Sequence, residues 1–205
     1  LQYVAWNGQK VEQKNLRPAQ TFLDIALNDK PLAPGSNAVL VVKWAYTLPA
    51  GADAARECVC DSSTFFVPYW YPQIAVYDDL NGWASHPYTG QQEFFNDFSD
   101  YDVTIKMPIG FQVWATGEWQ NAAEILTPAY LSRWDKAHTS AEVVSIFSEK
   151  ELKAGGVYKA SEGSFRFKAI DVPDFAFATS DHYNWDANSV IVDDKTGRRT
   201  FVAAA

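Results

Sequence analysis

The sequence predicts a mainly β fold, a β-sandwich or a saddle-shaped sheet, with one short helical insertion at about residues 127–147. Short stretches in which apolar and polar residues alternate recur along the chain, and this alternation is typical of half-buried strands. Turn-forming pairs such as Asn7-Gly8 separate these stretches, as in antiparallel sheets. No segment repeats with a period of about 20–50 residues, which excludes a solenoid or a propeller.

Composition limits both the architecture and the partners. The 205 residues are enough for one large β-domain, so we expect a single domain over residues 1–205. A hydrophobic content of 47% with 20% charged residues excludes a disordered chain. The net charge of −8 argues against nucleic acid or an anionic membrane as partner, because both attract a basic face. No apolar run is long enough to span a bilayer.

The first part of the chain is expected to form a hairpin and two further strands. Residues 1–14 predict the hairpin, because Asn-Gly favours a two-residue turn with positive φ. Residues 21–27 alternate as a half-buried strand, and residues 37–48 predict a strand that crosses the whole sheet.

The central segment, residues 64–108, is expected to consist of two strands that hold a long ordered insertion. Residues 64–77 are nearly continuous in aromatic and β-branched residues, while residues 79–98 combine turn chemistry with aromatic side chains of their own. A loop of this kind is packed rather than floppy. Residues 101–107 and 111–115 alternate cleanly and predict a meander of two antiparallel strands.

The helical insertion begins at Thr127-Pro128, which predicts an N-cap followed by proline in the first turn. Apolar residues then recur at helical spacing up to His138. Residues 140–147 suit either a second short helix or a strand. Beyond them we expect strands at 163–170 and 175–180 and a closing hairpin over 189–203.

The sequence contains none of the common catalytic signatures: no HExxH, GxSxG, Gly-rich phosphate loop or CxxC pair. His86, His138 and His182 lie far apart and are interpreted as ordinary surface or turn histidines. Carboxylates cluster in three places and are compatible with calcium binding or an acid/base pair, but Asp is equally common in turns and loop caps. These clusters are Asp78-Asp79, Asp97 with Asp100 and Asp102, and Asp193-Asp194.

Cys58 and Cys60 are separated by a single residue. This spacing is too short for an easy disulfide, and two cysteines are too few for a structural zinc site. We therefore predict a pair of free thiols in a loop.

Aromatic residues gather in the central segment, and they allow two interpretations. They either form a stacking platform for sugar rings or fill the layer beneath the loop, and core filling is the preferred interpretation. The residues concerned are Trp70, Tyr71, Trp83 and Tyr88.

Several motifs follow one another in a fixed order from this segment onward. They are found at residues 71–79 (YPQIAVYDD), 81–83 (NGW), 86–88 (HPY), 90–98 (GQQEFFNDF), 101–103 (YDV), 115–117 (ATG), 171–178 (DVPDFAFA) and 185–186 (WD). Together they closely resemble the amino-terminal β-domain of bacterial aminopeptidase N-like zinc metallopeptidases, which belong to the thermolysin-like gluzincins. The resemblance spans roughly residues 1–192.

The resemblance implies a non-catalytic role. In that family a saddle-shaped β-domain precedes a thermolysin-like hydrolase domain, which carries HExxH and binds the zinc. This chain has no HExxH, so it resembles the front piece of a metallopeptidase, truncated at its amino terminus and cut before the catalytic zinc domain. The chain alone is expected to be inactive and to hold no cofactor, with zinc in the missing domain. Bacterial relatives suggest a periplasmic or cell-surface location.

The resemblance also implies partners: the catalytic domain of the same polypeptide and a peptide substrate in the cleft between the domains. In the family, the β-domain lends an acidic or amide residue to hold the substrate's α-amine, because a buried ammonium needs an acceptor. No Glu or Gln stands at residues 65–69, where it should lie. Tyr69 and Gln73 are therefore the substrate-binding candidates, with Trp83 and Tyr88 in the interface loop.

Two alternatives complete the expectations from sequence. A free-standing carbohydrate-binding or adhesion module would use Trp83 and Tyr88 without any catalytic partner. Missing amino-terminal strands would leave an unpaired edge, and such edges recruit another chain. We therefore expect self-association through exposed edge strands.

Overall fold

A computed structural model describes residues 1–27, 32–50, 56–108, 110–159 and 163–205. The protein is mainly β, with several antiparallel sheets and few helices among these residues. The chain divides into two compact units: unit 1 comprises residues 1–47 and 73–97, and unit 2 comprises residues 48–72 and 98–205. The central segment predicted as one feature therefore contributes its middle to unit 1 and both ends to unit 2. The single domain over residues 1–205 stays a prediction.

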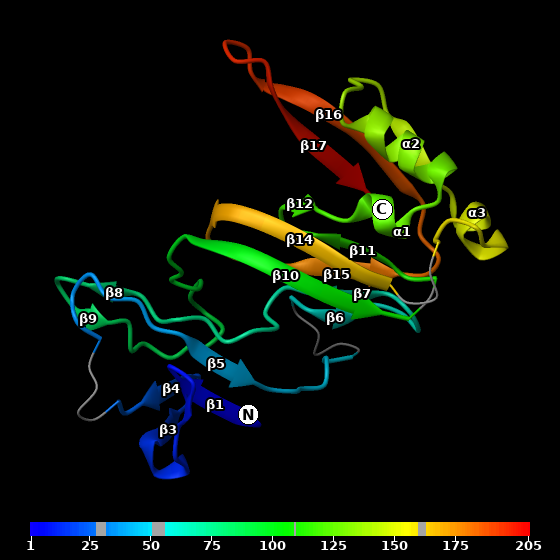
Figure 1. The fold of residues 1–205 in the computed structure, drawn as a ribbon. Helices are drawn as coiled ribbons and strands as arrows, with labels where there is room; N and C mark the ends of the chain where they lie inside the picture. Colours follow the sequence, from blue (N-terminus) through cyan, green and yellow to red (C-terminus); the bar gives the residue numbers. More distant parts are fainter. Residues whose placement is uncertain (28–31, 51–55, 109, 160–162) are drawn as a thin grey trace. The chain divides into compact units, whose positions relative to one another are not determined.

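Unit 1 contains a three-stranded sheet and two small two-stranded sheets (Figure 1). The predicted amino-terminal hairpin is confirmed, with Asn7 and Gly8 at φ 47° and 80° in its turn. The strand predicted over residues 37–48 is reduced to four residues. The strands are β1 (Tyr3–Trp6), β2 (Gln9–Lys10) and β5 (Leu40–Lys43) in the order β2-β1-β5, β3 (Leu16–Ala19) with β4 (Phe22–Ile25), and β8 (Tyr77–Asp78) with β9 (Gly82–Trp83); a 3-10 helix, η1, spans Gln13–Asn15.

Unit 2 contains three antiparallel sheets. The first has the order β10 (Ser99–Met107), β14 (Gly163–Val172), β12 (Glu118–Trp119). The second has the order β11 (Gln112–Ala115), β15 (Phe177–Ser180), β7 (Phe65–Val67), β6 (Cys58–Val59), and the third has the order β13 (Val144–Phe147), β16 (Trp185–Asp193), β17 (Arg198–Ala204).

The predicted meander of residues 101–107 and 111–115 is wrong, because these strands lie in different sheets. β10 pairs with β14, which matches it in length and alternation (Figure 1). This pairing sets Val103 opposite Phe167 and Ile105 opposite Phe165. β11 pairs with β15 instead. The predicted strands near 163–170 and 175–180 and the closing hairpin, formed by β16 and β17, are confirmed.

The core of unit 2 is built from all three sheets and is therefore sandwich-like. Trp119 of β12 lies near its centre: its ring stacks on Phe165 at 5.4 Å between centroids and meets Trp185 of the third sheet at 6.1 Å. The largest fully buried side chains here are aromatic or branched aliphatic: Phe147, Phe165, Phe175, Leu126 and Ile146.

The helical insertion is only partly as predicted. α2 (Pro128–Ala137) follows Thr127 with proline in its first turn, as expected, and it lies against β13 and β16 (Figure 1). The insertion does not extend to residue 147, because Val144–Phe147 is the strand β13, in which apolar side chains are buried against the core. Two further helices flank this region among the described residues, α1 (Ala122–Ile125) and α3 (Glu149–Ala154).

No helix in the described ranges combines the length and hydropathy that crossing a bilayer requires.

Gly117 allows a close approach between the turn before β12 and the middle of β14. Its φ is 86°, and a Cβ at this position would overlap the carbonyl oxygen of Lys168. Gly197, in the β16–β17 turn, also has positive φ, at 70°, but has nothing within 4 Å of the corresponding position.

We predict that Gly117→Ala destabilises the fold more than Gly197→Ala. Both changes cost roughly 1–2 kcal/mol for the left-handed backbone, and the overlap at Gly117 adds about 1–3 kcal/mol. Urea unfolding of both variants, followed by circular dichroism, measures the difference in the free energy of unfolding. Equal losses for the two variants would contradict the close approach.

Candidate functional site

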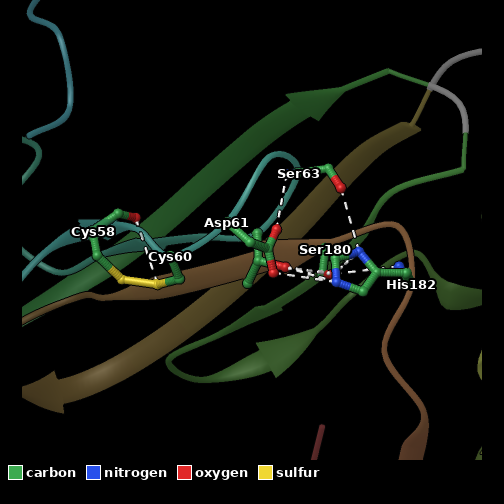
Figure 2. Close-up of a disulfide and its surroundings, with 7 residues drawn as sticks. Cys58, Cys60, Asp61, Ser63, Ser180 and His182 are labelled. Atoms are coloured by element: carbon green, nitrogen blue, oxygen red, sulfur yellow. Dashed lines mark hydrogen bonds and ion pairs between the residues drawn. A yellow bond between two sulfur atoms is a disulfide. The ribbon is translucent and has the colours of Figure 1, made fainter. Parts of the chain in front are cut away.

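A polar cluster of unit 2 surrounds His182, just after the end of β15. The ring lies between two carboxylates: Nδ1 is 2.8 Å from Asp181 Oδ1, and Nε2 is 3.2 Å from Asp61 Oδ2. Asp61 comes from the turn between β6 and β7, so the contact joins parts of the chain far apart in sequence. Figure 2 shows the Asp61 and Ser63 side chains of this turn directed toward the His182 ring.

Hydroxyl groups complete the cluster. Ser63 Oγ donates to Asp181 Oδ1 at 2.6 Å and lies 3.3 Å from His182 Nδ1. Beneath them, the buried Thr64 and Ser180 hydroxyls lie 3.0 Å apart, and Ser180 Oγ accepts the His182 backbone N–H at 3.3 Å. We call Asp61, Ser63, Asp181 and His182 the His182 latch.

The charges of the latch support one another. The hydrogen bond to Asp181, followed by the Asp61 charge, raises the pKa of His182 above its ordinary value, although burial partly opposes this. The Ser63 backbone N–H chiefly lowers the pKa of Asp61, and the Ser63 hydroxyl chiefly lowers the pKa of Asp181. Both shifts strengthen the attraction between the imidazole ring and the two carboxylates wherever His182 is protonated.

This arrangement does not activate Ser63 as a nucleophile, despite its Ser, His and Asp composition. His182 Nδ1 faces Asp181 Oδ1 at 2.8 Å, closer than Ser63 Oγ at 3.3 Å, so the carboxylate competes with Ser63 for this nitrogen. The Ser63 hydroxyl is moreover directed to Asp181. The latch therefore fastens the β6–β7 turn to the segment after β15, at the end of a sheet in which β7 and β15 already pair.

A disulfide joins Cys58 and Cys60 immediately before the latch turn (Figure 2). The prediction of two free thiols is therefore wrong. Side chains two residues apart along an extended chain point to the same face, and here the Cα atoms are 5.0 Å apart, within the bridging range.

The two predicted substrate-binding residues belong to different units. Tyr69, in unit 2, is 36% exposed, and its hydroxyl accepts a hydrogen bond from Arg56 Nη1 at 3.4 Å. Gln73, in unit 1, is exposed.

The four aromatic residues of the central segment separate into two groups. Trp70 and Tyr71 pack against the core of unit 2, as the core-filling interpretation predicts. Tyr88 is half-buried and stacks on Phe94 at 4.4 Å. Core filling is wrong for Trp83, which is 60% exposed.

Trp83 forms an exposed aromatic pair with Tyr77 on the small β8–β9 sheet. The Tyr77 ring is 65% exposed and meets Trp83 edge-on at 5.1 Å. Two strands of two residues each cannot bury rings of this size from both sides, so both rings remain open to solvent.

The predicted carboxylate clusters act in turns and ion pairs. Asp78 and Asp193 accept backbone N–H groups of their own turns. Asp102 pairs with Arg166 across β10 and β14, at 2.6 Å. Within the part of the chain that the structure describes, no group of three or more His, Cys, Asp or Glu residues is arranged to hold a metal ion.

The three histidines differ in their surroundings. His86 is exposed, as predicted for an ordinary surface histidine. His138 is half-buried and stacks on Phe201 at 4.2 Å between centroids. The ordinary-histidine interpretation missed His182, whose partners come from a turn more than 100 residues earlier; the only local signal was the polar Ser-Asp-His sequence after a strand.

A second polar network in unit 2 joins Tyr71, Tyr101 and Asp174. The Tyr71 hydroxyl donates to Asp174 Oδ1 at 2.8 Å and lies 2.7 Å from the Tyr101 hydroxyl. Burial, together with these contacts, raises the pKa of Tyr71 well above its ordinary value. Asp174 Oδ1 also accepts the Phe175 backbone N–H at 2.7 Å, so the network is anchored to the chain just before β15.

Models of known protein families, curated proteins and solved structures were all compared with this chain, and none of them matches. Its function is therefore inferred from its own residues.

We predict that His182→Gln lowers stability in a pH-dependent way. The latch contribution of His182 is fully present below its unfolded pKa of about 6.5 and is lost as pH rises through the higher folded pKa. The carboxylate contribution fades as pH falls below about 3.8. The wild-type advantage should therefore be largest between these values, as measured by urea unfolding across a pH series.

The matched control is His86→Gln, which removes an exposed histidine from unit 1. Its effect on the free energy of unfolding should vary little with pH. A pH-independent loss in His182→Gln would contradict the ionic latch.

Proposed function

We propose that this chain is the non-catalytic amino-terminal β-domain of an aminopeptidase N-like zinc metallopeptidase. In this role it shapes the substrate cleft and docks the catalytic domain of the same polypeptide, which binds the zinc and hydrolyses the peptide. A periplasmic or cell-surface location goes with this proposal.

The Tyr71 network is the observation that carries the proposal. Its three side chains come from three of the motifs that resemble the metallopeptidase domain: Tyr71 from 71–79, Tyr101 from 101–103 and Asp174 from 171–178. Such motifs would be expected to meet if they serve one structural purpose. Their convergence supports treating them as parts of one domain rather than as separate chance matches.

Tyr69 is the weaker of the two substrate candidates, because a cation lies beside its hydroxyl. An α-ammonium group needs a hydrogen-bond acceptor without a competing cation beside it. Tyr69 has the Arg56 guanidinium against its hydroxyl, and that charge repels an ammonium. The Gln73 amide oxygen is an uncharged acceptor on an exposed side chain.

The first test asks whether catalysis requires a further domain. This chain, incubated with zinc and an aminoacyl anilide, should show no turnover above a buffer blank. The complete reading frame that contains it should encode HExxH downstream, and its product should turn the anilide over. In that product Gln73→Ala should raise KM roughly ten- to a hundredfold, since a hydrogen bond to a charged group contributes about 1.5–3 kcal/mol.

Two outcomes would contradict the proposal. One is turnover by this chain alone that survives repurification. The other is a complete reading frame without a zinc-peptidase motif. Tyr69→Ala is the matched comparison for Gln73→Ala, because the proposal assigns it the smaller change in KM.

The exposed Tyr77–Trp83 pair favours a second candidate, a free-standing carbohydrate-binding or adhesion module. Sugar rings present C–H groups that pack on open aromatic faces, and both rings of this pair are mostly exposed. This reading needs no catalytic partner.

For the second candidate, Trp83→Ala should weaken oligosaccharide binding about two- to tenfold, because an aromatic contact contributes about 0.5–1.5 kcal/mol. A glycan array identifies the sugar, and calorimetry measures the Kd. The control is Phe95→Ala, which removes another exposed aromatic ring of unit 1. Unchanged affinity in Trp83→Ala would exclude the pair as a sugar platform.

Self-association through edge strands belongs to the same proposal. β5 and β17 are outer strands of their three-stranded sheets. Val41 on β5 and Val202 on β17 are 38% and 44% exposed. Outer strands with exposed apolar side chains recruit further strands, so each offers a place for a second copy to add.

A further inference from the structure

The Cys58–Cys60 disulfide closes a very small ring at the edge of unit 2. Only Val59 lies between the two cysteines. Cys58 is half-buried in β6, the outer strand of its sheet, whereas Cys60 follows the strand and is exposed. Cys60 is thus the more exposed of the two bridged residues.

This bridge can contribute little to the stability of the fold. In the chain-entropy account, a disulfide stabilises by restricting the unfolded chain, and the effect grows with the number of residues enclosed. A bridge that encloses one residue adds only a small restriction to the unfolded chain, because local backbone geometry already limits so short a segment. The position of Cys58–Cys60 is therefore poorly suited to a structural cross-link.

Non-covalent contacts already close the turn that follows the bridge. The Cys60 backbone N–H donates to the Thr64 carbonyl at 2.8 Å, and Ser63 N–H donates to Asp61 Oδ1 at 2.9 Å. Strand pairing sets Cys58 opposite Phe66. The His182 latch then fastens the same turn to the segment after β15, so the turn remains held when the bridge opens.

The reduced state also has a ready partner for the exposed thiol. Cys60 Sγ lies 3.8 Å from the carbonyl oxygen of Cys58, within range of a weak S–H donor (Figure 2). On reduction the two sulfurs must move apart by side-chain rotation, because non-bonded sulfur atoms cannot stay at bonding distance, and the Cys58 carbonyl remains an acceptor beside Cys60.

From these observations we propose that Cys58–Cys60 is a thiol–disulfide exchange site for small external thiols, with Cys60 Sγ as the sulfur that is attacked. Exposed disulfides are the labile ones, and exchange depends on access to the attacked sulfur. The proposal concerns a surface of unit 2 and does not depend on the proposed peptidase role.

The exchange proceeds in two balanced steps. The thiolate of an external thiol bonds to Cys60 Sγ, the S–S bond breaks, and Cys58 leaves as a thiolate that takes a proton from water. A second thiolate then attacks the external sulfur of the mixed disulfide and releases Cys60 as a thiolate. Two external thiols are oxidised to one disulfide, and the protein disulfide is reduced to two thiols.

Native-state reduction is the first test. Excess dithiothreitol, without denaturant, should release two thiols per chain, counted by maleimide labelling and intact mass. The reduced chain should keep the circular-dichroism spectrum and the urea midpoint of the oxidised chain. Release of thiols only in denaturant, or loss of the fold on reduction, would overturn the proposal.

Matched single variants test which sulfur is attacked. Cys58→Ser leaves only Cys60, and Cys60→Ser leaves only Cys58, so each rate of maleimide labelling reports one thiol. Cys60 should label at least tenfold faster, because it is the exposed residue; the double variant supplies the blank. Equal rates, or faster labelling of Cys58, would overturn the assignment of Cys60.

Discussion

Unit 2 depends on the close approach of the β12 turn to β14. Gly117 has positive φ and no Cβ, which lets the chain pass directly over the Lys168 carbonyl. β12 can then pair with β14 and place Trp119 in the core. A strand of two residues adds few backbone hydrogen bonds, so its value lies in the indole that it positions between aromatic rings of β14, β16 and α2. The absence of a Cβ at Gly117 therefore allows Trp119 to contact aromatic side chains of two sheets and of helix α2.

The local sequence pattern predicted where strands lie along the chain, but it did not predict which strands pair with one another. Alternation identified the strands near 101–107 and 163–170, and turn chemistry identified the closing hairpin, because both signals lie within a few residues. The partner of a strand is set by matching lengths and buried faces across the whole chain. β10 therefore pairs with β14, about 60 residues away, rather than with the next strand in sequence. The same limit applies to Val144–Phe147. Its sequence is compatible with a helix or a strand, and its pairing with β16 makes it a strand.

The site was less predictable than the fold, for the same reason. Only the polar Ser-Asp-His sequence sets His182 apart from a turn histidine, and its Asp61 partner lies in another turn. The disulfide was missed because sequence spacing does not give the Cα separation. The exposure of aromatic side chains could not be predicted from the sequence either. The same aromatic-rich segment contributes Trp70 to the core and leaves the Trp83 ring exposed, although composition does not distinguish the two residues.

The two buried or half-buried polar clusters of unit 2 constrain the chain in different ways. The Tyr71 network is partly buried and has little charge, so its hydrogen bonds select one arrangement of three segments whose apolar pattern alone would permit others. The latch is closer to solvent and charged, so pH and salt change its strength. Three of the motifs that resemble a metallopeptidase domain meet at the first cluster, in unit 2, whereas the exposed Tyr77–Trp83 pair belongs to unit 1. The peptidase and sugar-binding proposals share Tyr77 and Trp83, which lie in the motifs at 71–79 and 81–83, but only the peptidase proposal draws on the Tyr71 network.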